Sequence, residues 1–307
     1  MHLPGALATL IHGALTGAAD RGVAVRLAYN LDNDGLIPVP PPPRTEPALL
    51  ESLPFPTAAI PGTPDLMHHK YVIRDSEAVW TGSTNWTADS WTREENVILT
   101  AESRDLAARF SADFEQLWSK RDVERSGKVD SAPVLVGETS VRAWFCPGRG
   151  EQLAHRIAKA IGTARRRIRI ASPVISSGPI LGTLAQVACD GKVDLAGVVD
   201  RTQVLEVVRQ WDANGNATWK EPLLRTALGR APFSGKRSTP YAPGRVHDYM
   251  HAKVTVADDV VFLGSFNLSH SGEMNAENVL EIADAALADR LAAYVDTIRG
   301  RYPAIDL

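Results

Sequence analysis

The sequence has little cysteine and almost no net charge. Among its 307 residues the only cysteines are Cys146 and Cys189, whose wide separation fits neither a zinc-ligand pattern nor a disulfide framework. We therefore predict free thiols, no metal site and no cofactor. The net charge of −3 provides no general attraction to nucleic acids or anionic membranes, so any basic binding surface must be local.

Long apolar segments are also missing. No stretch of the sequence approaches the roughly eighteen consecutive apolar residues that a membrane-spanning helix needs. Residues 1–22 lack the basic start of a secretory signal peptide, and His12 and Asp20 lie within a helical pattern. We predict that the chain, as written, is cytoplasmic.

One polar pattern occurs twice in the sequence. Each copy reads H-x-K, then D, then G-S-x-N. The first copy comprises His68, Lys70, Asp75, Gly82, Ser83 and Asn85, and the second comprises His251, Lys253, Asp258, Gly264, Ser265 and Asn267. Ser83 to Glu95 and Ser265 to Glu277 both span twelve positions, and both glutamates precede Asn-Val. A lone H-x-K or G-S-x-N is ordinarily a surface pair or a turn, but the joined and repeated pattern indicates two copies of one unit.

The repeated residue types suit chemistry on a phosphodiester. Such a bond requires a nucleophile, an acid for the leaving oxygen and fixed donors around the phosphoryl group. A histidine can be the nucleophile when neutral and the general acid when protonated, so two histidines allow both roles. Apolar and β-branched residues after each H-x-K predict a strand, and a second strand before each G-S-x-N predicts a hairpin.

The paired segments resemble the two HKD motifs of the phospholipase D superfamily. The resemblance implies metal-independent hydrolysis or transfer of phosphodiesters through a phosphohistidine intermediate. Carried over by position, it makes His68 the nucleophile and His251 the general acid, with the reverse assignment left open. It also implies that the phosphoryl oxygens are held by Lys70, Lys253, Asn85 and Asn267, supported by Ser83 and Ser265.

The acidic residues of the pattern receive supporting roles. Asp75 and Asp258 fall in the predicted hairpin turns, so we expect them to hold the shape of the turn or form ion pairs. Glu95 and Glu277, at equal offsets, are our candidates for orienting a histidine through its other ring nitrogen; the alternative is a carboxylate at a helix start.

The predicted fold is α/β, with two repeats related by a pseudo-twofold axis and each built from a mixed β-sheet flanked by helices. We assign residues 1–125 to the first repeat, 126–140 to a linker and 141–307 to the second repeat. The second repeat begins with a predicted strand, helix and strand at residues 141–145, 152–163 and 167–171. The first repeat has no counterpart, so we expect that Met1 is not the true start and that this unit is missing.

Three further segments bear on the substrate. Residues 30–66 contain ten prolines and are predicted to be a surface loop, either a simple connection or one wall of the cleft. A basic cluster is either solvated or attracts phosphates, and it consists of Lys159, Arg165, Arg166, Arg167 and Arg169. Residues 214–244 interleave aromatic and cationic side chains, which suits stacked bases, a lipid headgroup or a loop packed on itself.

Three functional hypotheses follow. We favour a phospholipase D-type hydrolase acting on a phospholipid headgroup. The alternatives are a metal-independent nuclease acting on single-stranded nucleic acid, and an inactive fragment or binding module that keeps the fold. The sequence does not decide between hydrolysis and transfer. It also leaves the oligomeric state open.

Overall fold

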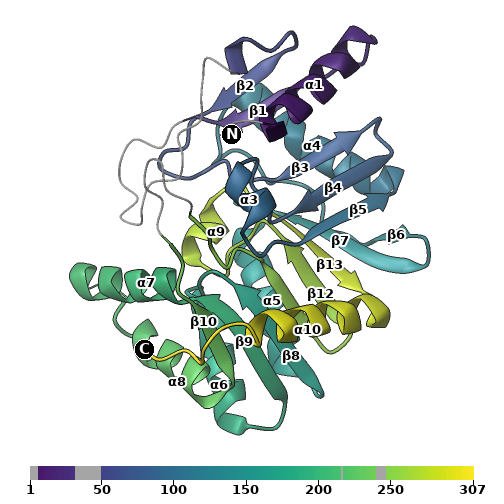
Figure 1. The fold of residues 1–307 in the computed structure, drawn as a ribbon. Helices are drawn as coiled ribbons and strands as arrows, with labels where there is room; N and C mark the ends of the chain where they lie inside the picture. The colour runs from purple at the N-terminus through teal and green to yellow at the C-terminus, as the bar shows by residue number, and fades with distance from the viewer. Residues whose placement is uncertain (1–5, 32–49, 216, 240–246) are drawn as a thin grey trace.

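The computed structural model describes residues 6–31, 50–215, 217–239 and 247–307 as two α/β repeats (Figure 1). The N-terminal repeat contains α1 (Ala6–Asp20), β1 (Leu27–Asn30), β2 (Thr57–Ile60), β3 (Tyr71–Arg74), β4 (Ala78–Gly82), α3 (Ala88–Thr92), β5 (Ile98–Glu102) and α4 (Arg104–Lys120).

The C-terminal repeat is larger. It contains β6 (Val134–Val136), β7 (Thr139–Phe145), α5 (Gly150–Thr163), β8 (Arg167–Ser172), α6 (Gly178–Asp190), β9 (Asp194–Asp200), α7 (Arg201–Asn214), α8 (Lys220–Arg230), β10 (Phe233–Lys236), β11 (Val254–Ala257), β12 (Val260–Gly264), α9 (His270–Met274), β13 (Asn278–Ala283) and α10 (Ala285–Arg299).

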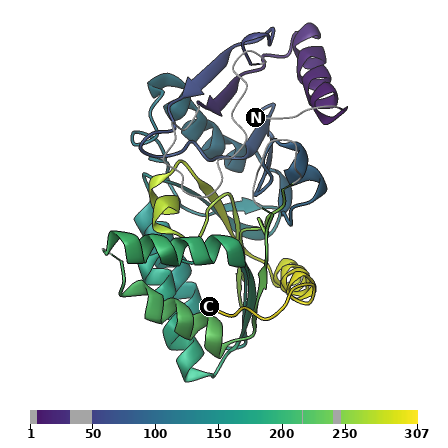
Figure 2. The ribbon, with the colours of Figure 1, turned by 60° about the vertical axis from the view of Figure 1, so that its left-hand side comes forward.

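One mixed sheet of eight strands organises the C-terminal repeat, in the order β10-β9-β8-β11-β12-β13-β7-β6. Strands β8, β9 and β10 are parallel, and the remaining pairs are antiparallel. The α10 helix covers one face and α5 and α6 lie on the other (Figure 2). On β8, Ile168 and Ile170 are fully buried in the core that the sheet forms with α5 and α6.

The N-terminal repeat has two separate small sheets within the described residues. Strands β1 and β2 pair in parallel, and β3, β4 and β5 form an antiparallel sheet against α4. By position, β2 and β1 correspond to β10 and β9, and β3-β4-β5 corresponds to β11-β12-β13. No described strand corresponds to β8, which joins these two groups in the C-terminal sheet, or to β7.

Two predicted irregular segments contain strands. The predicted loop at 30–66 includes β2, which pairs with β1 because the run Thr57–Ile60 lies between prolines rather than containing one. Of that segment, residues 32–49 lie outside the described residues. The predicted linker at 126–140 includes β6, which pairs with β7 at the edge of the sheet. Both predictions of unstructured connection are therefore wrong over these short stretches.

Candidate active site

Backbone bonds between the repeats bring the two H-x-K segments together. The segments lie immediately before β3 and β11, as the predicted hairpins require. The His68 N–H donates to the carbonyl oxygen of Ala276 at 2.9 Å, and the His251 N–H donates to that of Glu95 at 3.1 Å. Each histidine is therefore held by the residues that lead into the last strand of the other repeat.

His68 pairs with the carboxylate of Glu277. Its Nδ1 lies 2.7 Å from Oε1 of the fully buried glutamate. Burial opposes the ionisation of Glu277, but the neighbouring His68 and Lys70 outweigh it and lower the carboxyl pKa. An ionised carboxylate can only accept, so Nδ1 carries the hydrogen and the Nε2 lone pair of a neutral His68 is free to attack.

The two motif lysines are buried beside the histidines. Each Nζ donates to the carbonyl oxygen of the histidine two residues earlier, at 2.6 Å for Lys70 and 2.8 Å for Lys253. Burial lowers the pKa of Lys70 to about 8, and burial together with the charge of Lys70 lowers the pKa of Lys253 well below its ordinary value. Two close, poorly solvated ammonium groups favour an anionic ligand between them.

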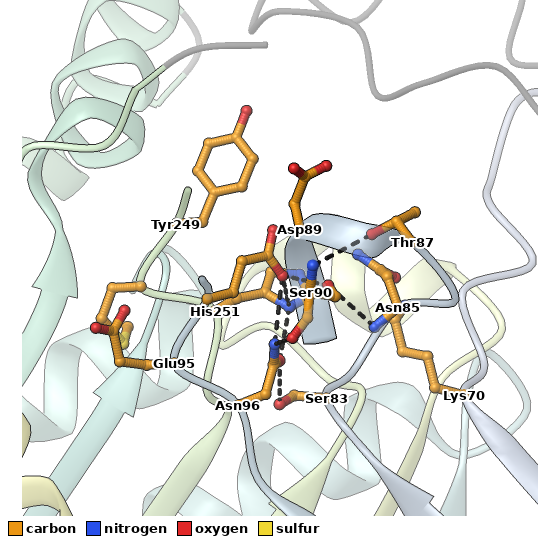
Figure 3. A network of polar contacts seen from close by, with 12 residues as sticks. Lys70, Ser83, Asn85, Thr87, Asp89, Ser90, Glu95, Asn96, Tyr249 and His251 are labelled. Atoms are coloured by element: carbon orange, nitrogen blue, oxygen red, sulfur yellow. Dashed lines mark hydrogen bonds and ion pairs between the residues drawn. The ribbon is translucent and has the colours of Figure 1, made fainter. Parts of the chain in front are cut away.

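His251 has an amide partner in place of a carboxylate. Its Nδ1 lies 3.0 Å from Oδ1 of Asn96 and 3.5 Å from Oε2 of Glu94 (Figure 3). The orientation of the Asn96 amide is fixed because its Nδ2 donates to the Ser90 carbonyl at 3.1 Å and Ser83 Oγ donates to its Oδ1 at 2.7 Å.

A difference of one residue between the two strand pairings explains this asymmetry. Gly82 pairs with Ile98, whereas Gly264 pairs with Val279. Two positions before each partner stand Asn96 and Glu277, which are therefore structural equivalents although the sequence spacing aligns Glu95 with Glu277.

The prediction that Glu95 orients a histidine is wrong in this geometry. Its carboxylate accepts from Lys236 Nζ at 2.8 Å and from the Tyr302 hydroxyl, both in the C-terminal repeat. Sequence reasoning missed Asn96, because the shared Glu-Asn-Val hides the one-residue offset. The signal that could have found it is the alternation of β5, where Leu99 and Ala101 pack inward and Ile98 and Thr100 face outward.

The motif serines brace the site instead of facing it. Ser83 Oγ and Ser265 Oγ each accept a bond of 3.0 Å from the backbone N–H of the residue that leads into or begins the following strand. Their own N–H groups donate to the carbonyls of Val97 and Asn278 and are therefore not free to bind phosphate, so any support from these serines comes through the strands. The motif glycines permit this approach, since a Cβ at Gly82 would lie 2.0 Å from the Val97 oxygen.

The motif asparagines lie at the rim of this network. The Asn85 backbone N–H donates to Ser90 Oγ at 3.3 Å, which fixes the turn and leaves its amide beside Lys70 (Figure 3). The Asn267 Oδ1 atom is buried without a hydrogen-bond partner among the described residues. Their proposed contact with phosphoryl oxygens stays a prediction.

The motif aspartates lie in the hairpin turns, as expected. Asp75 and Asp258 both have left-handed backbone, with φ of 52°. The Asp258 carboxylate accepts three backbone N–H groups from residues 165–167 at 2.8 to 3.1 Å, whereas that of Asp75 is exposed. Among the described residues, neither carboxylate contacts a motif histidine, so their support of the site is through the hairpins.

Both histidines favour the neutral form. Burial and the two lysines lower the pKa of His251 well below its ordinary value. Burial also lowers the pKa of His68, although Glu277 acts in the opposite direction. Within the described residues, no group of three or more potential metal ligands converges, and no helix is both long and apolar enough to cross a bilayer.

A family model described as cardiolipin synthase, PLD-like domain, matches residues 8–118 and 157–299. The chain belongs to this family. One matched part lies in each repeat, and each includes that repeat's H-x-K segment.

Other members of the phospholipase D superfamily resemble parts of the chain. This chain is 39% identical over 57 residues to mitochondrial cardiolipin hydrolase of Xenopus tropicalis, and 34% identical over 56 residues to the same enzyme of Mus musculus. These stretches are 18% of this chain and 27% and 25% of the relatives, so the match spans about a quarter of their length. Phosphatidylserine synthase of Haemophilus influenzae has the same fold, with a TM-score of 0.58, 14% identity, and coverage of 84% of this chain and 69% of that one.

Proposed function

We propose that the protein is a phosphodiesterase that acts through a phosphohistidine on His68. The observation that carries the proposal is the unequal pairing of two histidines across the repeats, with a carboxylate behind His68 and an amide behind His251. The ionised partner fixes a nucleophilic tautomer on His68 and stabilises the positive charge that its imidazole gains on phosphorylation. An amide stabilises an imidazolium less, which makes protonated His251 the stronger acid.

In the first step, Nε2 of His68 attacks phosphorus and the bond from phosphorus to the leaving oxygen breaks. Protonated His251 gives its Nε2 proton to that oxygen. In the second step, neutral His251 takes a proton from water as the water oxygen attacks phosphorus, and the bonding electrons of the P–N bond return to Nε2 of His68. The ammonium groups of Lys70 and Lys253 stabilise charge on the other phosphoryl oxygens.

A phospholipid is the substrate class that we favour, because two features that suggested a nucleic acid are used internally. Arg166, Arg167 and Arg169 are ion-paired with Asp259, Asp289 and Asp296 at 2.5 to 2.9 Å. The side chain of Lys220 lies over Trp211 and Trp219 and donates to a backbone carbonyl. The relatives named cardiolipin hydrolase agree with this preference.

Turnover in the presence of a chelator tests the proposal. With bis(p-nitrophenyl) phosphate in EDTA we expect release of p-nitrophenolate at the rate seen without EDTA, since no metal takes part in the mechanism. Cardiolipin and phosphatidylcholine vesicles should then be cleaved faster than single-stranded DNA. A folded protein that cleaves none of these substrates would refute the proposed activity, and faster cleavage of DNA would replace the lipid assignment with the nuclease.

The pH dependence of kcat/KM for a phospholipid, whose leaving oxygen needs a proton from an acid, should have its maximum on the acidic side. The acid form of His251 has a lowered pKa, so its population in the free enzyme decreases as the pH rises. A further decrease is expected above pH of about 8, where Lys70 loses its charge. Lys70→Arg should remove only the decrease near pH 8, since arginine stays protonated. A kcat/KM that stays constant between roughly pH 5 and 9 would contradict this assignment, because that range includes the ordinary pKa of histidine.

A further inference from the structure

The peptide group that precedes His251 is held by two buried charged side chains. Its N–H, which belongs to Met250, donates to Oδ2 of Asp200 at 3.1 Å. Its carbonyl oxygen, which belongs to Tyr249, accepts from Nζ of Lys236 at 3.2 Å. Asp200 and Lys236 are 0% and 4% exposed, so these charge-assisted hydrogen bonds form where water competes little and where they are strong.

The two charged residues lie at the ends of neighbouring strands. Asp200 is the last residue of β9 and Lys236 the last residue of the parallel strand β10, and the two are register partners. The Asp200 carboxylate also accepts from the Gln203 N–H at 3.0 Å and from the Ser238 hydroxyl at 2.8 Å. Burial raises the pKa of Asp200 to about 6, so at neutral pH the carboxylate is mainly ionised and can only accept. The strand ends therefore present one fixed acceptor and one fixed donor to the segment that carries His251.

Lys236 also holds His251 by a second route. Its Nζ donates to the carboxylate of Glu95 at 2.8 Å, and the carbonyl oxygen of Glu95 accepts the backbone N–H of His251 at 3.1 Å. The Tyr302 hydroxyl donates to the same carboxylate. The backbone leading into His251 is thus fixed at its carbonyl oxygen at position 249 and at the N–H groups of positions 250 and 251.

The equivalent peptide group in the N-terminal repeat is held by neutral groups. It precedes His68, and its N–H, which belongs to Met67, donates to Oδ1 of the Asn30 amide at 2.9 Å. Its carbonyl oxygen, which belongs to Leu66, accepts the backbone N–H of Ala276 at 2.8 Å. Both repeats therefore fix this peptide group, but they do so with different chemistry.

The difference between the repeats is one of charge, because the positions correspond. Asn30 ends β1 as Asp200 ends β9, and the register partner of Asn30 is Ile60, where Asp200 has Lys236. A hydrogen bond with one ionised partner is about twice as strong as a neutral one. The histidine assigned as general acid thus has the stronger backbone anchor.

The ring contacts of the two histidines show the opposite distribution of charge. Nδ1 of His68 bonds the Glu277 carboxylate, and Nδ1 of His251 bonds the Asn96 amide. A carboxylate bonded to the ring of the acid would raise its pKa and make it a weaker proton donor. Charged contacts to the backbone instead fix the position of the His251 imidazole without bonding its ring.

We propose that Asp200 and Lys236 are positioning residues for His251, which clamp the peptide group before it and so keep its Nε2 within reach of the leaving oxygen and of the attacking water. The inference rests on the proposed function, because it concerns the steps in which His251 gives or takes a proton. Loss of the clamp therefore impairs those steps and spares the attack of His68 on phosphorus.

Asp200→Ala tests the clamp, because it removes the acceptor of the Met250 N–H. With bis(p-nitrophenyl) phosphate, a burst of p-nitrophenolate stoichiometric with the protein is expected, since attack by His68 on this substrate needs little acid. The kcat should decrease about 10²-fold, the cost of displacing a catalytic group by roughly 1 Å, because hydrolysis of the phosphohistidine uses His251 as base. For phosphatidylcholine, whose leaving oxygen needs the proton, kcat/KM should decrease by a similar factor.

Two further variants separate a clamp from a general loss of structure. Asp200→Asn keeps an oxygen that can accept the Met250 N–H, as Asn30 does in the other repeat, and should recover roughly five- to tenfold of the lost kcat, the worth of one neutral hydrogen bond. Lys236→Met removes the donor to the Tyr249 carbonyl and should give the same pattern as Asp200→Ala: a full burst followed by slow turnover.

Asp284→Ala is the matched control, because Asp200 also caps a helix. Oδ1 of Asp284 accepts the Leu287 N–H at 2.8 Å at the start of α10, as the Asp200 carboxylate accepts the Gln203 N–H at the start of α7. This variant loses an aspartate cap of the same kind away from the clamp. It should keep both the burst and the kcat of the unchanged protein.

A burst that decreases in proportion to kcat in Asp200→Ala and Lys236→Met would overturn the proposal, because it would mean fewer folded molecules and not a displaced acid. If Asp200→Ala does not fold, Asp200→Asn and Lys236→Met decide the matter, and an unchanged kcat in both would overturn the clamp. These results concern the clamp alone if the unchanged protein turns over. Failure of the unchanged, folded protein to cleave either substrate would refute the proposed function and this inference with it.

Discussion

Replacement of His68 by alanine should abolish turnover of bis(p-nitrophenyl) phosphate, with a decrease in kcat of about 10⁴-fold or more, as expected when a covalent nucleophile is lost. No phosphoenzyme should form. The reason is specific to this site: Nδ1 of His68 makes a 2.7 Å hydrogen bond to the fully buried carboxylate of Glu277, whereas the Glu94 carboxylate lies 3.5 Å from Nδ1 of His251, whose hydrogen-bond partner is the Asn96 amide.

His251→Ala should give a different defect. Because p-nitrophenolate is a good leaving group, phosphorylation of His68 needs little help from an acid, but hydrolysis of the P–N bond still needs His251 as base. We expect a burst of p-nitrophenolate followed by slow turnover, with a p-nitrophenyl phosphoryl group on His68 detected by peptide mass spectrometry.

The matched control for both variants is His155→Ala, whose side chain is 63% exposed on α5 and lies outside the site. It should keep the turnover and the thermal unfolding temperature of the unchanged protein. Phosphate found on His251 in the unchanged protein would reverse the assigned roles, and full activity of His68→Ala would refute the histidine mechanism.

The sequence was sufficient to predict the two repeats, the hairpins and the pair of histidines, because repeated spacing and strand alternation are local properties. The helix at 104–120 was also predictable, since Ser103 caps it and Leu106, Phe110 and Leu117 form one buried stripe. Family membership follows from the same motifs and agrees with the match over both repeats.

The residue that bonds Nδ1 of each histidine could not be predicted. Its identity depends on the register in which the strand ending at Gly82 or Gly264 pairs with the following strand. Glu95 and Glu277 have the same spacing and the same following residues, yet the Glu95 carboxylate accepts from Lys236 and Tyr302, which lie 141 and 207 positions away in the sequence. Contacts between such distant positions leave no signal in the spacing of a motif. The same limit applies to Ser83 and Ser265, whose hydroxyls are used by the next strand.

Glu277→Gln should lower kcat by about 10² to 10⁴-fold, the range seen when a carboxylate that orients a catalytic histidine becomes an amide. Glutamine has nearly the shape of glutamate, so the loss is one of charge and of tautomer control. The variant gives His68 the kind of partner that His251 has in the unchanged protein. The amplitude of the p-nitrophenolate burst should decrease with kcat, because formation of the phosphohistidine becomes slow.

The reciprocal variant, Asn96→Asp, is the control that separates charge from packing. A carboxylate beside His251 raises the pKa of its imidazole, so the decrease in kcat/KM that accompanies loss of the His251 proton should move to higher pH while the phosphoryl group remains on His68. Combining the two substitutions places the carboxylate behind His251 alone, and phosphate should then appear on His251. If both single variants only lower thermal stability and leave the pH profile and the phosphorylated residue unchanged, Glu277 and Asn96 are structural residues and the division of labour between the histidines has another cause.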